Sequence, residues 1–284
     1  ADSANGLHLL EHVVPTAALN TLLLITGVAF IAAIVGTGCA WLLANFTFPG
    51  QTVLSWALLL PLAMPSYIVA YAYLDLLHPL GPLQEYLRAL LGYSGPREFR
   101  LPDVRSLVSV IVLLGFVLYP YVYIGARAAF QMQSRNLADA ARSLGESRWG
   151  VLRRVSLPLA RPAIVAGVTL AVLEALNDVG ASEMMGVQTL TTVIYSTWIT
   201  RSDIGTAAQF AIGVLAIVLL VCLVERQARL RRGYSTPDGN RSTNPERLSG
   251  TRAWVALVSA ALPVVIGFLL PAAYLLFQAV VRIS

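Results

Sequence analysis

The sequence contains no lysine. All 20 of its cationic residues are arginine, and charged residues make up only 12% of the 284-residue chain. A phosphate-binding Walker loop needs its lysine, and Schiff-base or pyridoxal phosphate chemistry needs an amine, so we expect neither ATP hydrolysis nor such chemistry in this chain. The net charge of +5 does not indicate nucleic acid, because the arginines lie between long apolar runs and not on a compact basic face.

Cysteine and histidine are also scarce. The two cysteines, Cys39 and Cys222, each lie within an apolar run, which argues against a disulfide framework and a four-ligand zinc site. Of the three histidines, His8 and His12 have the i, i+4 spacing of one helical face, but no HExxH pattern surrounds them. We therefore predict no metal site and no cofactor bound by this chain.

Apolar residues dominate instead. Hydrophobic residues make up 57% of the chain and the mean hydropathy is +0.69, which is the composition of a membrane protein. A helix needs about 20 predominantly apolar residues to cross a bilayer, and six stretches are candidates. They are residues 16–44, 53–77, 104–126, 162–176 extending toward 180, 206–224 and 253–281. The sequence predicts an all-α, polytopic transmembrane helical bundle with about six spans.

Arginine is concentrated in two of the connecting segments. Residues 127–161 and 226–252 hold seven arginines each, which makes 14 against six elsewhere. Because cytoplasmic loops retain positive charge during insertion, we expect both segments in the cytoplasm. The N-terminal segment, residues 1–15, is then expected in the periplasm.

Prolines interrupt several of the expected spans. Pro61 and Pro65 stand four residues apart in the second span, Pro120 lies in the third, and Pro263 and Pro271 lie in the last. Each removes a helix hydrogen bond and disfavours helix at the preceding residue. A tolerated kink is one interpretation, since proline is common in membrane helices. For the pair Pro61 and Pro65 a hinge is the other, and both stay open at this point.

Two short amphipathic helices are expected on the outer side. Leu83, Leu87, Leu90 and Leu91 give one apolar face between the second and third spans, and residues 189–203 place apolar side chains near one face after the fourth span. We predict that both helices lie at the outer membrane interface.

The 34-residue segment 128–161 is too long for a plain connector. Ser134 or Asn136 can cap a helix that runs through Leu144. Gly145 can then end this helix in the left-handed conformation at little steric cost. The helix has an apolar face of mostly small residues, formed by Leu137, Ala140, Ala141 and Leu144. A second helix is expected over residues 146–155, ended by Pro158.

The same segment carries a spaced motif. It reads Asp139-Ala140-Ala141, three residues, Gly145, nine residues, and then Val155-Ser156-Leu157-Pro158. This pattern resembles the EAA loop of the permease subunits of binding-protein-dependent ABC importers, with Asp in place of Glu and Val in place of Ile. The resemblance implies a set of residues that couple the permease to its ATPase, namely Asp139, Ala140, Ala141, Gly145, Val155, Leu157 and Pro158.

Further implications follow from the resemblance. Permeases of this class have a MetI-like transmembrane domain and lie in the bacterial inner membrane. They work with ABC ATPase subunits, which use the ATP, with a periplasmic substrate-binding protein and with a second transmembrane unit. We expect the same partners here, together with membrane lipid and without nucleic acid.

Other stretches, among them LLLPLAMPSYIVAYAY and EALNDVGASEMMGVQTL, resemble permeases of the ferric iron type. Such permeases often carry two transmembrane units in one chain. The expected organisation is a MetI-like domain over residues 16–224, a cytoplasmic linker over 225–252 and the first helix of a second unit over 253–284. The resemblance thus predicts a fragment that covers the first half of a longer permease, with ferric iron as its substrate.

Glu174, Asn177 and Asp178 are the candidate pathway residues. The resemblance and membrane energetics both point to them, because an acid within a span costs roughly 2.5–3.5 kcal/mol and therefore usually faces a cavity or a partner. Three interpretations of Glu174 stay open. It lines or gates the pathway, it forms an ion pair or hydrogen bond with a neighbouring helix, or it lies harmlessly at the interface.

Competing functions also stay open. A related permease would import thiamine, a phosphonate or an inorganic anion. An ion-driven secondary transporter is a second alternative, against which the EAA loop argues. A membrane enzyme that uses Glu174 and Asp178 is a third, but the sequence offers neither a nucleophile–base pair nor a metal motif for it.

Overall fold

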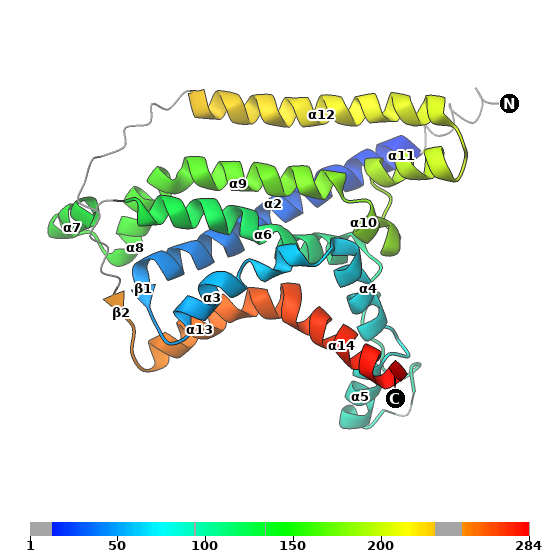
Figure 1. The fold of residues 1–284 in the computed structure, drawn as a ribbon, viewed down its shortest axis with the longest axis horizontal. Helices are drawn as coiled ribbons and strands as arrows, with labels where there is room; N and C mark the ends of the chain where they lie inside the picture. Colours follow the sequence, from blue (N-terminus) through cyan, green and yellow to red (C-terminus); the bar gives the residue numbers. More distant parts are fainter. Residues whose placement is uncertain (1–12, 94, 134, 231–245, 284) are drawn as a thin grey trace.

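The computed structural model describes residues 13–93, 95–133, 135–230 and 246–283. Most of these residues are helical and very few lie in strands, which confirms the predicted all-α bundle. The long helices lie roughly side by side, and the short helices gather at the two ends of the bundle (Figure 1).

Three long helices form the centre of the bundle. They are α2 (Val14–Asn45), α6 (Leu107–Gln131) and α9 (Leu157–Asn177), and each packs against the other two. Their contacts bury the largest side chains of the core, including Tyr119 and Tyr123 of α6. Most other buried core residues are aliphatic or alanine.

Glycine allows the central helices to approach closely. A Cβ atom added at Gly36 of α2 would lie 2.7 Å from the carbonyl oxygen of Tyr119, and one added at Gly167 of α9 would lie 2.6 Å from the Cα atom of Val122. Small residues at such crossings are typical of helix packing in membranes, where van der Waals contact supplies much of the attraction.

The second expected span is broken. Its segments are α3 (Gln51–Ala57), a 3-10 turn (Leu60–Ala63) and α4 (Ser66–Leu76). The axis bends by 90° between the segment ending at Ala63 and α4. Pro65 disfavours helix at Met64, whose backbone is extended, with φ −104° and ψ 120°. Pro61 is buried inside the 3-10 turn. The interruption is therefore present as a bend, and hinge motion stays a prediction.

Helix α5 (Pro82–Leu91) is the short amphipathic helix expected between the second and third spans. Its polar side, not its leucine side, faces the protein, because Gln84 and Arg88 are buried whereas Leu90 and Leu91 are exposed. An outward apolar face suits the predicted position at the membrane interface.

The second helix of segment 128–161 does not end at Pro158, so this prediction is wrong. Helix α8 (Arg148–Val151) passes into a π-helical turn (Leu152–Ser156) and then directly into α9. The N–H of Leu157 donates to the carbonyl of Leu152, five residues back. Proline is tolerated here because the π-turn directly before it already shifts the hydrogen-bond pattern of the helix.

Three helices follow α9 in the described residues up to Leu230. They are α10 (Gly180–Met184), α11 (Leu190–Ile199) and α12 (Ile204–Leu230). Thr189 and Thr192 form a capping box at the start of α11, as each side chain bonds the backbone N–H of the other residue. Before α12, Asp203 accepts the N–H of Thr206 at 3.0 Å, and hydrogen bonds from Thr206 lower the pKa of this carboxyl.

The last helix runs against the first part of the chain. Its segments are α13 (Thr251–Val264), a π-helical turn (Val265–Leu269) and α14 (Leu270–Ile283), which continue through Pro263 and Pro271 as α6 continues through Pro120. They pack on α2, α3, α4 and α6. Just before α13, β2 (Glu246–Arg247) pairs in parallel with β1 (Phe46–Thr47).

Four described helices are long and apolar enough to cross a membrane, and the bent pair can form a fifth span. The four lie within Val14–Asn45, Leu107–Gln131, Trp149–Asn177 and Thr251–Ile283. The span expected over residues 206–224 falls within α12. Its apolar part, Ile204–Leu220, is shorter than the four helices named above.

Candidate coupling and translocation sites

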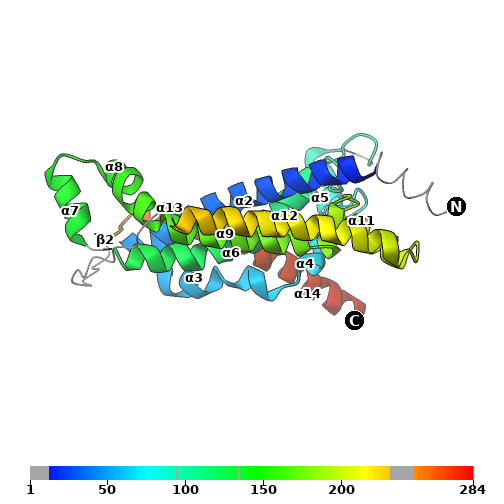
Figure 2. The same cartoon turned by 90° about the horizontal axis from the view of Figure 1, so that it is seen from above.

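Helix α7 (Arg135–Ser143) and helix α8 project from one end of the bundle, opposite the end that carries α5, α10 and α11 (Figure 1, Figure 2). The turn between α7 and α8 closes as a Schellman motif. The N–H of Gly145 donates to the carbonyl of Arg142 at 2.9 Å, and the N–H of Glu146 donates to that of Ala141 at 3.0 Å. Gly145 has φ +92°, as predicted for a left-handed end of the first helix.

The projecting pair is exposed along the motif. Asp139 and Ala140 are exposed, and Ala141 is half-buried. Asp139 and Arg142 form an ion pair at 3.8 Å whose side chains are both more than half exposed, so this pair adds little stability.

Two large apolar side chains are also exposed on this segment. Leu144 is 86% exposed and Trp149 is 57% exposed. The guanidinium of Arg153 lies 4.7 Å from the centre of the Trp149 ring. Leu144 belongs to the apolar face predicted from the sequence, whereas Trp149 is not among the predicted coupling residues. The i, i+4 spacing of Trp149 and Arg153 on a helix was the available signal.

The rest of the motif connects the projecting pair to the bundle. Val155 and Leu157 are half-buried, and Pro158 is exposed. The side-chain amide of Gln133, just after α6, donates to the carbonyl of Ser156 at 2.9 Å. Helix α8, the π-turn and α9 form one unbroken helix, which connects the projecting pair to the centre of the bundle.

Asp178 lies at the other end of α9, where it joins three elements. Its Oδ2 atom accepts the hydroxyl of Ser66, the first residue of α4, and its Oδ1 atom accepts the N–H of Ala181 in α10 at 3.0 Å. A Cβ atom added at Gly180 would lie 2.8 Å from the Cβ atom of Tyr67. The α9–α10 junction therefore sits directly on the start of α4, beside the bend.

The predicted pathway residues do not form one cluster of contacts. Glu174 and Asn177 are exposed on α9, whereas Asp178 is half-buried and hydrogen-bonded. Asp178 and the pair Pro61 and Pro65 were predicted from the sequence as separate features. Ser66, which follows Pro65 and bonds to Asp178, was not predicted. No sequence signal for this link was available, since Ser66 and Asp178 are 112 residues apart.

Metal ligands are not gathered anywhere in the part of the chain that the structure describes. Among those residues, no group of three or more His, Cys, Asp or Glu side chains could hold a metal ion.

An apolar helix bundle with a projecting helix pair at one end and a polar junction at the other is the architecture of a polytopic transport protein. The chain belongs to the family of binding-protein-dependent transport system inner membrane components, because a model of that family matches residues 32–234, more than half of the chain. It is therefore an ABC transporter permease component with a MetI-like domain, and not an enzyme.

Curated relatives agree with this assignment. The chain is 32% identical over 211 residues to a probable molybdenum ABC transporter permease of Haloferax volcanii, which covers 74% of this chain and 73% of that protein. It is 30% identical over 200 residues to the molybdenum transport system permease ModB of Escherichia coli, covering 68% and 84%.

A longer relative is the Fe(3+)-transport system permease FbpB 2 of Haemophilus influenzae. The chain is 26% identical to it over 206 residues, which cover 72% of this chain but only 36% of that protein.

Among solved structures, a bacterial alginate ABC transporter in complex with an alginate pentasaccharide-bound periplasmic protein has the same fold. The TM-score is 0.60 at 16% identity, over 76% of this chain and 78% of that chain.

Proposed function

We propose that this chain is the permease unit of an ATP-driven importer for a tetrahedral oxyanion of the molybdate type. The observation that carries this proposal is the pair of molybdenum permeases at 30% identity or above, each aligned over more than two-thirds of its length. Molybdenum(VI) in neutral water is a tetrahedral dianion. An inorganic anion was among the alternatives left open by the sequence.

Ferric iron, the substrate predicted from the sequence, is the second candidate. It is favoured by the long helix α13–α14 that follows residues 225–252, because this order suits a permease with two units in one chain. FbpB 2, of which the present chain covers 36%, is long enough for such an arrangement. On this proposal, residues 253–284 are the first helix of a second unit that packs on the first.

The proposed mechanism begins at the projecting pair α7–α8. Closure of ATPase subunits pushes on the exposed residues Asp139 and Ala140, and on Leu144 and Trp149 beside them. The continuous helix α8–α9 transmits this displacement to Asp178, and the hydrogen bond from Ser66 passes it to α4. The 90° bend then lets α4 swing between inward and outward access, as alternating access requires.

We also propose that α7 and α8 lie in the cytoplasm and the N-terminus in the periplasm. This orientation is supported by the 14 arginines in the two segments expected on that side.

The substrate is tested in proteoliposomes that contain the complete importer and its cognate binding protein. Uptake of labelled molybdate, tungstate, sulfate and ferric iron is measured with and without ATP. ATP-dependent uptake of an oxyanion supports the first proposal. Uptake of ferric iron alone would replace it with the second, and gradient-driven uptake without ATP would contradict both.

The pathway role of Glu174 is tested in the same vesicles. Glu174→Gln and Glu174→Ala are expected to lower uptake by at least tenfold while leaving membrane insertion unchanged, because the side chain is exposed on α9 and stabilises no helix contact. Glu85→Gln, at an exposed position on α5, is the matched control. Normal uptake by Glu174→Ala would remove this residue from the pathway.

A further inference from the structure

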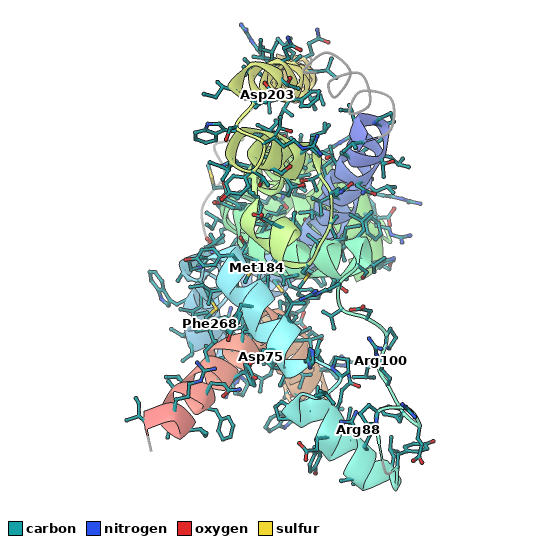
Figure 3. The ribbon with its side chains drawn as sticks, turned by 90° about the vertical axis from the view of Figure 1, so that its right-hand side faces the viewer. Asp75, Arg88, Arg100, Met184, Asp203 and Phe268 are labelled. Atoms are coloured by element: carbon teal, nitrogen blue, oxygen red, sulfur yellow. The ribbon has the colours of Figure 1, made fainter. Side chains whose placement is uncertain are left out.

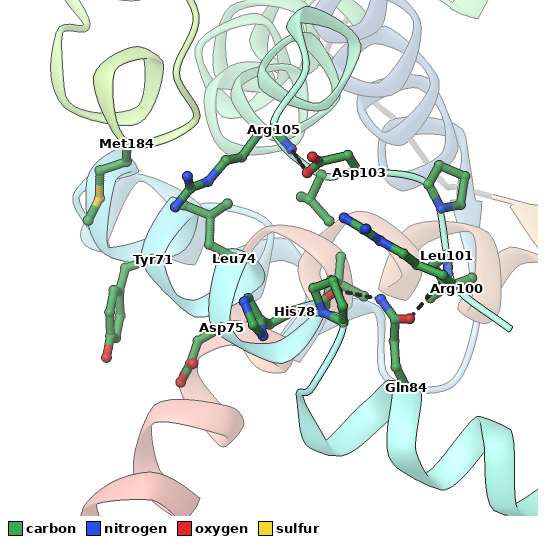
Figure 4. A pocket seen from close by; sticks show the side chains of 14 residues that line it. Tyr71, Leu74, Asp75, His78, Gln84, Arg100, Leu101, Asp103, Arg105 and Met184 are labelled. Carbon is green, nitrogen blue, oxygen red and sulfur yellow. Dashed lines mark hydrogen bonds between the residues drawn. The ribbon is translucent and has the colours of Figure 1, made fainter. Parts of the chain in front are cut away.

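A cavity of about 270 Å³ opens at the end of the bundle that carries α5 and α10 (Figure 3, Figure 4). This volume is several times the roughly 30 Å³ that one water molecule occupies in the liquid. Its walls come from the end of α4, the turn after it, α5, the segment 100–105 and Met184 of α10. The cavity therefore lies where α4, α5, α10 and the segment 100–105 meet.

Buried polar side chains hold these walls in place. Gln84 is 1% exposed, and its amide donates to the carbonyl of Leu77 at 2.8 Å and accepts the N–H of Leu101 at 3.1 Å. Arg88 is 7% exposed and donates to the carbonyl of Pro79 at 2.9 Å. Helix α5 thus fixes both the turn after α4 and the segment 100–105, which gives the cavity a defined shape.

Two guanidinium groups reach this cavity without a partner. Arg100 and Arg105 both line it, and within the described residues neither side chain has a hydrogen bond or an ion pair. Figure 4 shows them extending from the segment 100–105, across the cavity from Asp75 and His78. Two guanidinium groups on one cavity offer several N–H donors in the fork geometry that binds an oxyanion.

The carboxylates that share the cavity are already occupied by neutral donors. Asp75 accepts the hydroxyl of Tyr274 at 2.6 Å, on the side of the cavity that faces α14. Asp103 accepts the backbone N–H of Arg105 at 3.0 Å. Neither carboxylate therefore pairs with the guanidinium groups, which stay available for a ligand.

The cavity also adjoins the proposed pathway. Met184, in its wall, lies in α10, which follows Asp178 directly. Tyr71, which also lines the cavity, lies one helical turn after Tyr67 on α4. An anion held between Arg100 and Arg105 is thus placed beside the junction that moves in the proposed mechanism.

The distribution of arginine gives independent support. Of the six arginines outside the two segments expected in the cytoplasm, four fall between residues 88 and 105. Positive charge is disfavoured on the outer side during insertion. The hydrogen bond to Pro79 accounts for Arg88, and a binding role accounts for Arg100 and Arg105.

We propose that Arg100 and Arg105 form a receiving site for a tetrahedral oxyanion at the outer mouth of the permease, where the anion pauses between release from the binding protein and entry into the pathway. This inference rests on the proposed oxyanion function and adds to it a site on the permease itself.

The test compares two double variants of the complete importer that lose the same charge. Arg100→Gln/Arg105→Gln removes the proposed site, and Arg97→Gln/Arg201→Gln removes two exposed arginines that do not line the cavity. Three quantities are measured for each, in nanodiscs or proteoliposomes. They are binding of labelled molybdate without binding protein, ATP-dependent molybdate uptake, and the affinity of the importer for molybdate-loaded binding protein.

The site variant is expected to lose at least tenfold in molybdate binding and in uptake, with less than a twofold change in affinity for the binding protein. The control variant is expected to retain all three. Arg100→Lys/Arg105→Lys, which keeps the charge, should recover part of the binding.

Two outcomes would overturn the inference. In one, uptake by the site variant equals that of the unmodified importer. In the other, uptake by the site variant falls only in proportion to its loss of affinity for the binding protein. The arginines would then contact an acidic surface of the binding protein and not the anion. Failure of the unmodified importer to take up any oxyanion would contradict the proposed function instead, so the two failures are distinguishable.

Discussion

Asp178 has the largest set of contacts among the candidate pathway residues. One carboxylate oxygen accepts the Ser66 hydroxyl and the other accepts the Ala181 N–H. Hydrogen bonds to a charged group contribute about 1.5–3 kcal/mol each, so this one side chain can hold the α9–α10 junction on α4. Glu174 and Asn177 stabilise no comparable contact and are free to face a partner or the substrate.

Asp178→Ala is expected to lower ATP-dependent uptake by about tenfold and to decrease the thermal stability, because both hydrogen bonds are lost. Asp178→Asn keeps one acceptor oxygen and should lose less. Ser66→Ala should have little further effect in the Asp178→Ala background, as residues in one contact couple. Asp203→Ala, which removes a helix cap away from α4, is the control; an equal loss of uptake in that variant would refute the specific role of Asp178.

Among the elements, the projecting pair α7–α8 depends on one backbone conformation. Gly145 has φ +92°, and no atom lies within 4 Å of a Cβ atom added there. A side chain at this position therefore meets backbone strain and not a clash. The left-handed conformation costs other residues about 1–2 kcal/mol, which is small for the whole bundle but large for a turn between two short helices.

Gly145→Val is expected to raise the ATP hydrolysed per molecule imported while leaving the bundle folded. Gly145→Asn, which tolerates positive φ, should stay close to the unmodified ratio. Gly92→Val is a second control, since Gly92 has φ +78° with equally open surroundings but lies at the opposite end of the bundle. If Gly145→Val leaves the ATP hydrolysed per molecule imported unchanged, the coupling role of this turn is refuted.

The close approach of α6 and α9 gives a separate prediction on stability. A Cβ atom at Gly167 would meet the Val122 Cα atom at 2.6 Å and the Tyr121 carbonyl oxygen at 2.7 Å, and backbone atoms cannot rotate away. Gly167→Ala is therefore expected to destabilise the protein by about 1–3 kcal/mol. Gly38→Ala in α2, where nothing lies within 4 Å, should be neutral or slightly stabilising. Unfolding of both variants in detergent measures the difference.

For the whole molecule, the attachment of α13–α14 to the rest of the bundle rests on hydrogen bonds with α4. Tyr274 donates to Asp75 at 2.6 Å, Gln278 donates to Tyr274 at 2.7 Å, and Tyr73 donates to the carbonyl of Ile266 at 2.5 Å. The bonds of Tyr274 with Asp75 and of Tyr73 with Ile266 join α4 to the last helix across about 200 residues of sequence, and Gln278 supports Tyr274 from within α14. The helix predicted to open a second unit is thus bonded to α4, the segment that follows the bend.

A protease site introduced between residues 231 and 245 tests this attachment. After cleavage, the piece that contains α13–α14 is expected to remain bound to the rest of the permease. Tyr274→Phe should release it at lower denaturant concentration, because a hydrogen bond to a carboxylate is lost. Tyr86→Phe, at an exposed position on α5, is the matched control and should behave as the unmodified chain does.

Local sequence determined much of this protein. Apolar runs of sufficient length made the helices, and Gly145 has the left-handed conformation that its position predicted. The spacing around Asp139 and Gly145 predicts the coupling segment. These features depend on residues close together in the chain, where composition and backbone preference dominate.

The tertiary structure alone decided the rest. Pro158 was expected to end a helix, but the π-turn directly before it allowed the helix to continue. The bond between Ser66 and Asp178, the burial of Gln84 and Arg88, and the shared cavity of Arg100 and Arg105 join separate elements. Such contacts are set by how helices pack, which no local pattern encodes.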